Sequence, residues 1–317
     1  MHRYIIKRLL LMIPVIIGVS FLVFFIMDLA PGDAVDILAP EGATAEDLEA
    51  IRHDLGLDQP VIVRYVKYMG GMLHGDMGVS YVSKTDVFDT YMEKLPATIK
   101  LSFASILVSI LLSVPLGIYS ATRQGTVQDN ISMIVAMIGL SMPNFWLGLL
   151  LIIVFSLNLG WFPSGGDQTL SSIVLPAITI GTGLMATLTR TTRSSMLDVL
   201  KQEYLRTARA KGIPEKIVIT SHALRNALIP IITIIGTQLA GVLGGSVLTE
   251  TVFAWPGVGR LIVDSLNMRD IPLVTGSIIM TTILLSIILL LVDLLYAVVD
   301  PRIKAQYVAK RGKKKHG

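Results

Sequence analysis

The chain contains six long stretches in which hydrophobic residues follow one another with few charged residues between them. A helix needs about 20 residues to cross the roughly 30 Å of hydrocarbon in a bilayer, and each stretch is about that long. The pattern therefore predicts an all-α integral membrane protein with six transmembrane helices. The predicted spans are residues 9–29, 101–120, 131–157, 172–192, 230–248 and 276–299.

The composition agrees with this pattern. Hydrophobic residues make up 52% of the 317 and charged residues 16%, and the mean hydropathy is +0.67. A soluble domain has about 45–50% apolar and about 25% charged residues. The chain is too apolar for that class, so the sequence predicts lipid as its surroundings and no nucleic-acid partner.

The distribution of Lys and Arg predicts how the chain crosses the membrane. Basic residues gather in the segment between the fourth and fifth spans and in the tail 302–317. Short loops rich in Lys and Arg stay on the cytoplasmic side. The first apolar run is too long for a cleaved leader and lacks a small-residue cleavage site, so we expect it to remain attached. We expect a multi-pass membrane protein with both termini in the cytoplasm.

The long segment 30–95 after the first span is expected to be a folded extracytoplasmic loop. Thr44 and Asp47 have the spacing of a capping box, and an amphipathic stretch follows them up to Gly56. Pro60 begins a second amphipathic helix, which Gly70 and Gly71 are expected to end. The residues on one side of that helix are Ile62, Tyr65, Val66 and Met69.

Segment 194–229, between the fourth and fifth spans, is charged but still patterned. Four apolar residues recur there at helical spacing and predict an amphipathic helix with a docking face. These are Met196, Val199, Leu200 and Tyr204. Gly212 can close that helix in a left-handed conformation, and Pro214 suits the first turn of a second helix. The segment is expected to be a cytoplasmic surface for a partner.

The chemistry-bearing residues argue against an enzyme. The chain has no cysteine, no G-x-x-x-x-G-K-[ST] phosphate loop, no H-E-x-x-H pattern and no pair of carboxylates in mid-membrane. His74 has several methionines near it, but one imidazole with thioethers does not suit a divalent ion, and methionine fills irregular packing. We expect no catalytic residue, no metal and no cofactor bound by this chain.

Two runs carry a family resemblance. The run 206–212 followed by 222–230 resembles the coupling loop of ABC importer permeases, most closely the dipeptide, oligopeptide and nickel branch. The wider superfamily has Glu-Ala-Ala, three residues and Gly at this place. Counting back from Gly212, Arg206-Thr207-Ala208 stands where that triplet would be, so only its alanine matches.

Further runs resemble the same branch along nearly the whole chain. They are residues 29–33, 55–60, 75–80, 95–98, 141–145, 250–261, 269–272, 291–296 and 300–302. The run 250–261, E-T-V-F-A-W-P-G-V-G-R-L, is the most specific of them and resembles an external segment over the outer mouth of the pathway. Its Phe253 and Trp255 are residue types that suit a membrane interface.

The resemblance implies a type I ABC importer permease fold. It divides the chain into an N-terminal helix and extracytoplasmic loop (1–95), an ABC transmembrane type-1 domain (96–301) and a basic cytoplasmic tail (302–317). It implies contacts to the ATPase through seven residues of the coupling loop: Arg206, Thr207, Ala208, Ala210, Gly212, His222 and Arg225. It also implies an outer gate at Phe253, Trp255, Pro256 and Gly257.

The resemblance implies partners as well. They are a second homologous permease, two ABC ATPase subunits that bind ATP and Mg²⁺, and an extracytoplasmic solute-binding protein. The implied function is ATP-driven import of peptides or a related small solute across a prokaryotic cell membrane.

One alternative is an ion-gradient-driven secondary transporter. Such a protein normally needs ion or proton ligands within the membrane and inverted repeats, and we find neither pattern here. Asp293 lies near the cytoplasmic end of the sixth span, where we expect it to cap the helix or pair with a neighbour. The solute stays open between dipeptides, oligopeptides, glutathione, nickel chelates and oligosaccharides. Pro143 in the third span is compatible both with a pathway lining and with a packing kink.

Overall fold

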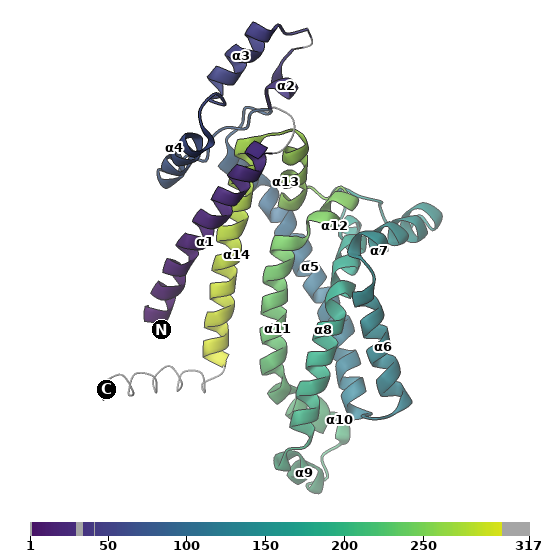
Figure 1. Ribbon diagram of the computed structural model, residues 1–317. Helices are drawn as coiled ribbons and strands as arrows, with labels where there is room; N and C mark the ends of the chain where they lie inside the picture. Colours follow the sequence, from purple (N-terminus) through teal and green to yellow (C-terminus); the bar gives the residue numbers. More distant parts are fainter. Residues whose placement is uncertain (1, 30–33, 41, 300–317) are drawn as a thin grey trace, which may run out of the picture. The chain divides into compact units, whose positions relative to one another are not determined.

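The computed structural model describes residues 2–29, 34–40 and 42–299, and nearly all of this part of the chain is helical (Figure 1). One isolated bridge, between Val79 and Asp86, is its only β pairing. The described residues fall into two compact units. Unit 1 holds residues 1–100 and 243–286, and unit 2 holds residues 101–242 and 287–317. The all-α prediction is confirmed, and the predicted tail 302–317 lies outside the described residues.

Five helical segments are long and apolar enough to cross a membrane. They are Arg8–Leu29, Val87–Thr122, Leu170–Leu200, Glu215–Gly244 and Ile271–Leu294. The third predicted span is different, because a 96° bend separates Val127–Ser141 from Asn144–Asn158. The bend falls at Met142 and Pro143, where proline disfavours a helical conformation of the residue before it. The predicted span 131–157 is therefore two helices, and the break lies at Pro143, where the sequence allowed a kink.

Unit 1 contains the N-terminal helices and the segment that follows the fifth span. Its elements are α1 (His2–Leu29), α2 (Ala34–Leu38), α3 (Ala45–Asp54), α4 (Val61–Leu73), the start of α5 (Val87–Thr122), α12 (Val247–Val252), α13 (Val258–Asn267) and the start of α14 (Ile271–Val299). The capping box of α3 forms as predicted, with Thr44 as N-cap and Asp47 closing it. Helix α4 continues through Gly70 and Gly71 to Leu73, so the predicted end at the two glycines was wrong.

Asp270 joins two distant stretches of unit 1. Its carboxylate accepts hydrogen bonds from the Ser80 hydroxyl, from the Tyr81 backbone N–H (3.1 Å) and from the Leu273 backbone N–H (3.3 Å). The side chain is buried and sits at the start of α14. A buried carboxylate is tolerated when N–H and O–H groups satisfy it, so the turn around residue 80 is fixed to the beginning of α14.

Unit 2 contains a bundle of long helices and the short helices between them. Its elements are the rest of α5, α6 (Val127–Ser141), α7 (Asn144–Leu151), η1 (Ile152–Asn158), η2 (Leu170–Ile173), α8 (Val174–Leu200), α9 (Glu203–Ala210), α10 (Glu215–Ile217), η3 (Val218–Ala223), α11 (Leu224–Gly245) and the end of α14. Segments η1 and η3 are π-helical.

Helices α5 and α8 approach closely because small residues meet between them. A Cβ atom at Gly117 would collide with Thr192, and one at Gly181 would lie 2.9 Å from the Ser105 carbonyl oxygen. Buried serines line the same side of α5, at positions 102, 105, 109, 113 and 120. This contact fixes the C-terminal part of α8, which leads into α9, against α5.

Candidate functional site

Helix α9 has one buried face and one exposed face. Leu205 and Ala208 are buried, whereas Arg206, Thr207 and Ala210 are exposed. The chain turns at Lys201 and Gln202 between α8 and α9. The predicted amphipathic helix is therefore two elements: Met196, Val199 and Leu200 belong to the end of α8, and only Tyr204 lies in α9.

The buried face of α9 belongs to a cluster that joins five helical elements. Its buried members are Ala121 of α5, Leu188 and Met196 of α8, Leu205 and Ala208 of α9, Val218 and Ala223 of η3, and Ala227 and Ile231 of α11. Close-packed interiors transmit displacement because they have little free volume. A force applied to α9 would therefore reach the adjoining ends of α5, α8 and α11 together.

The turn after α9 is stabilised by a left-handed glycine and by an ion pair. Gly212 has φ +75°, as predicted for the residue that closes this helix, and the N–H of Ile213 bonds back to the Ala208 carbonyl at 3.3 Å. Arg209 binds Glu215 across the turn, through Nε (3.0 Å) and Nη2 (2.9 Å). The hydrogen bond to Glu215 raises the pKa of Arg209.

A second set of bonds connects α9 to α11. Asn226 donates from Nδ2 to Tyr204 Oη at 2.8 Å and to the His222 carbonyl at 3.0 Å. Tyr204 Oη also donates to that carbonyl at 3.4 Å. His222 therefore contributes its backbone to the junction, and Arg225 is exposed on α11. Tyr204 was predicted only as an apolar member of the docking face, and Asn226 was not predicted as a site residue, although it lies within the run 222–230.

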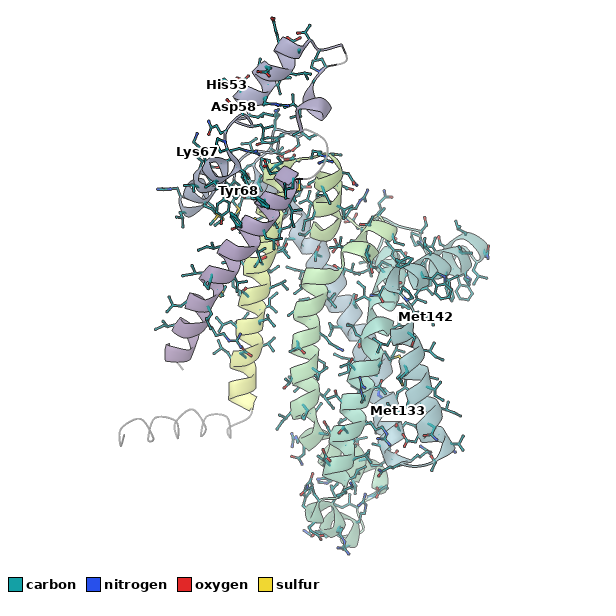
Figure 2. The ribbon with its side chains drawn as sticks, viewed as in Figure 1. His53, Asp58, Lys67, Tyr68, Met133 and Met142 are labelled. Carbon is teal, nitrogen blue, oxygen red and sulfur yellow. The ribbon has the colours of Figure 1, made fainter. Side chains whose placement is uncertain are left out.

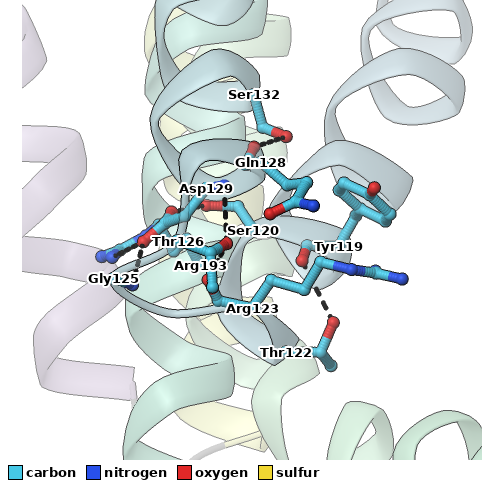
Figure 3. Close-up of polar contacts among 10 residues, drawn as sticks. All are labelled: Tyr119, Ser120, Thr122, Arg123, Gly125, Thr126, Gln128, Asp129, Ser132 and Arg193. Carbon is cyan, nitrogen blue, oxygen red and sulfur yellow. Dashed lines mark hydrogen bonds and ion pairs between the residues drawn. The ribbon is translucent and has the colours of Figure 1, made fainter.

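Asp129 and Arg193 form an ion pair near the same end of the bundle (Figure 3). Arg193 of α8 donates to both carboxylate oxygens of Asp129, from Nε at 2.8 Å and from Nη2 at 2.7 Å. The carboxylate also accepts from the Ser120 hydroxyl and from the Gly125 backbone N–H (3.0 Å). Asp129 is buried, so this bidentate pair fastens the α5–α6 turn to α8.

The predicted outer gate lies in unit 1. Phe253 and Trp255 are both buried, and Trp255 Nε1 donates to the Ala97 carbonyl at 2.9 Å. Pro256 is half-buried and Gly257 is buried. The expectation that the two aromatic residues face a membrane interface was wrong. They pack into the protein because the α12–α13 hairpin folds around them.

Glu250 is the polar centre of this hairpin and was missed from the sequence. Its side chain is fully buried, and its Oε1 accepts from Thr98 Oγ1 (2.9 Å) and from Ser246 Oγ (2.8 Å). Oε2 accepts from the Arg260 backbone N–H at 3.1 Å. A Cβ at Gly257 would collide with this carboxylate, and one at Gly259 would lie 2.9 Å from Oε2.

The two glycines of the P-G-V-G run therefore leave room for Glu250. The available sequence signal was a glutamate directly after an apolar run, followed by a pair of closely spaced glycines.

Two family models match this chain, and both describe membrane components of binding-protein-dependent transport systems. The family model described as "Binding-protein-dependent transport system inner membrane component" matches residues 113–305. A second model, "Binding-prot-dependent transport system membrane comp, N-term", matches residues 1–102.

Two relatives match along nearly their whole length. The oligopeptide transport system permease protein AppB of Bacillus subtilis (strain 168) is 44% identical over 315 residues, which cover 96% of this chain and 100% of the relative. The glutathione transport system permease protein GsiC of Escherichia coli (strain K12) is 41% identical over 304 residues, 96% of this chain and 99% of the relative.

Solved structures show the same fold at low identity. An inward facing structure of the MetNI methionine ABC transporter aligns with a TM-score of 0.56 at 18% identity, over 67% of this chain and 96% of that chain. An amino acid ABC transporter aligns with a TM-score of 0.50 at 13% identity, over 68% and 94%.

Proposed function

Since this chain belongs to the family of binding-protein-dependent transport permeases, a family of non-catalytic membrane subunits of ABC importers, we propose that it forms half of the membrane pathway for peptides or a related small solute. The peptide class is favoured by the relatives, which are named for oligopeptide and glutathione transport. ATP and Mg²⁺ bind in partner subunits.

One observation carries the proposal. Helix α9 presents Arg206, Thr207 and Ala210 on its exposed face, while its buried face packs on the ends of three long helices. An ATPase subunit that binds the exposed face and moves would displace α5, α8 and α11 through the buried cluster. Rigid-body motion of this kind is a known way to switch access.

The proposed assembly follows the family. Two permease subunits pair, each binds one ATPase subunit, and a solute-binding protein docks on the outer side. The bent pair α6 and α7–η1 counts as the third of six spans. The loop 194–229 and both termini lie in the cytoplasm, and most of segment 30–95 lies outside.

We assign the α12–α13 hairpin to the outer gate. Phe253, Trp255, Pro256 and Gly257 form its turn, and the buried Glu250 carboxylate keeps that turn in one shape. In this assignment the hairpin moves together with the start of α5, because Trp255 donates to the Ala97 carbonyl and Glu250 accepts from the Thr98 hydroxyl.

Reconstitution tests the proposal. The purified chain alone in proteoliposomes should hydrolyse no ATP and take up no peptide, and both activities should appear when the partner permease, the ATPases and the binding protein are added. Uptake by the chain alone, driven by a proton or sodium gradient, would establish the secondary-transporter alternative instead.

The orientation has its own test, because the chain has no cysteine. Glu49→Cys on α3 and Lys211→Cys after α9 both place a thiol at an exposed position. An impermeant thiol reagent applied to intact cells should label Glu49→Cys and should reach Lys211→Cys only after lysis. The opposite labelling would overturn the orientation.

A further inference from the structure

Helix α4 packs one apolar face on α1. Tyr65 makes edge contacts with Phe21 and Phe24, with ring centroids 5.4 and 5.8 Å apart, and Tyr68 lies 5.9 Å from Phe24. Tyr65 Oη also donates to the Ile17 carbonyl at 3.2 Å. The helix is therefore fixed against α1 along its tyrosine face.

A second apolar face of α4 points away from the protein. Ile62 and Val66 are 64% and 62% exposed, and Leu73 is 81% exposed. Spacings of four and seven residues place these three on one side of the helix. In water, such a stripe beside the tyrosine face would leave α4 apolar around most of its circumference, which is unusual for a surface helix.

The remaining side of α4 is polar. Lys67 Nζ donates to Gln59 Oε1 at 2.7 Å, and Arg64 binds Asp28 at 2.6 Å. In Figure 2, Lys67 lies on the side of α4 toward His53 and Asp58, and Tyr68 on the side of α1. A cavity of about 400 Å³ opens over this polar side, with His53 among its lining residues. On this polar side Lys67 is exposed, and Arg64 is largely covered in its ion pair with Asp28.

The position of α4 along α1 sets its depth. Its partners Ile17, Phe21 and Phe24 all lie inside the span Arg8–Leu29, five to twelve residues before Leu29. At 1.5 Å per residue, this is about 8–18 Å from the end of that span. An apolar groove lined by Phe21, Phe24, Phe25, Val61, Ile62 and Tyr65 runs between the two helices. The exposed stripe of α4 is thus continuous with the lipid-facing side of α1.

We propose that α4 lies in the bilayer as an interfacial helix, with Ile62, Val66 and Leu73 among the acyl chains and Lys67 at the headgroups. The occupant of the stripe is lipid, because the same surface continues onto a membrane-spanning helix. Part of the segment predicted to be an extracytoplasmic loop is then a membrane element. The choice of the outer leaflet rests on the proposed orientation; the embedding does not.

The test uses single cysteines in the assembled transporter. Ile62→Cys and Val66→Cys carry an environment-sensitive fluorophore, and the complex is placed in vesicles whose lipids bear a nitroxide on the acyl chain. Leu22→Cys, exposed on α1, is the membrane control, and Glu49→Cys, exposed on α3, is the aqueous control. Interfacial helices bury their apolar face by about 5–10 Å, so quenching at both α4 positions should be within about twofold of Leu22→Cys. It should exceed that at Glu49→Cys severalfold.

Three results would overturn the proposal. One is quenching at both α4 positions no greater than at Glu49→Cys. Another is a blue-shifted emission that the nitroxide lipids do not quench, which would place a protein partner on the stripe. The third is quenching that disappears when the binding protein docks. The labelling experiment with Glu49→Cys and Lys211→Cys decides the leaflet separately, so the two proposals fail independently.

Discussion

The junction around α9 and the hairpin α12–α13 are both short helical segments between long apolar helices, but they are stabilised differently. The α9 junction keeps every residue of its helix exposed except Leu205 and Ala208, and it closes with an exposed ion pair, Arg209–Glu215. The hairpin turns its aromatic residues inward around one buried carboxylate, Glu250. The first arrangement leaves a surface for a partner, and the second specifies a single internal shape. The following predictions are ordered by their expected cost in free energy of unfolding.

The largest effect is expected at Glu250. Glu250→Ala removes the acceptor of three hydrogen bonds from a buried site, which should cost about 3–5 kcal/mol, since bonds to charged groups contribute about 1.5–3 kcal/mol each and part of the loss relaxes. The measurement is denaturant unfolding of the solubilised complex. Thr251→Ala, at an exposed position of the same helix, is the control. Equal stabilities of the two variants would show that the carboxylate does not organise the hairpin.

The second-largest loss of stability is expected at the Asp129–Arg193 ion pair. Asp129→Asn leaves the Arg193 guanidinium without its charged partner and should cost about 2–4 kcal/mol, somewhat less than for a fully buried pair because Arg193 is partly exposed. Peptide uptake should fall with stability, because the α5–α6 turn is no longer fixed to α8. Asp198→Asn, on the exposed side of α8, should change neither quantity. If the Asp198→Asn and Asp129→Asn variants have the same stability and the same peptide uptake, the Asp129–Arg193 ion pair does not stabilise the bundle.

Gly212→Val should change activity more than stability. A side chain at φ +75° costs about 1–2 kcal/mol, and nothing lies within 4 Å of the new Cβ, so assembly should remain normal. Uptake should drop, because the turn that orients α9 against the ATPase is strained.

Gly160→Val is a matched control for this change, since Gly160 also has positive φ and open space around it. Gly125 suits the comparison less well, because its N–H bonds to Asp129. Similar uptake by the Gly212 and Gly160 variants would remove the coupling role assigned to α9.

The smallest effect is expected at Arg209. Both partners of its ion pair are more than one-third exposed, so Arg209→Ala should cost about 0.2–1 kcal/mol, the range of surface pairs. Raising the salt concentration should reduce the difference between wild type and variant. A loss of stability above about 1 kcal/mol that salt does not reduce would contradict this prediction. The α9 junction would then depend on its ion pair as strongly as the α12–α13 hairpin depends on Glu250.

Most of the helical framework was predictable because apolar runs and caps are local signals. Thr44 with Asp47 gave the start of α3, and the positive φ at Gly212 followed from its place after α9. The break between α8 and α9 was not predictable, since apolar spacing continues from Met196 to Tyr204 across Lys201 and Gln202. A turn cannot be recognised from apolar spacing when the spacing on both sides of it still fits one continuous helix.

The polar centres were missed for another reason. Glu250 takes its donor Thr98 from 152 residues away, and Asp129 takes Arg193 from 64 residues away. Pairings over such separations leave no pattern in a single sequence. The burial of Trp255 likewise depends on the Ala97 carbonyl, so its residue type alone favoured a membrane interface.

The π-helical segment η3 has a consequence for how this protein tolerates changes in length. Its buried residues are spaced by five positions, from Val218 to Ala223, whereas Ala223, Ala227 and Ile231 of the same cluster follow at intervals of four. A π turn holds one residue more than an α turn. Deleting Ser221 would therefore let an ordinary α turn form, with Ala227 and Ile231 still facing the cluster. The same deletion between Ala227 and Ile231 would rotate all later positions of α11 by about 100°.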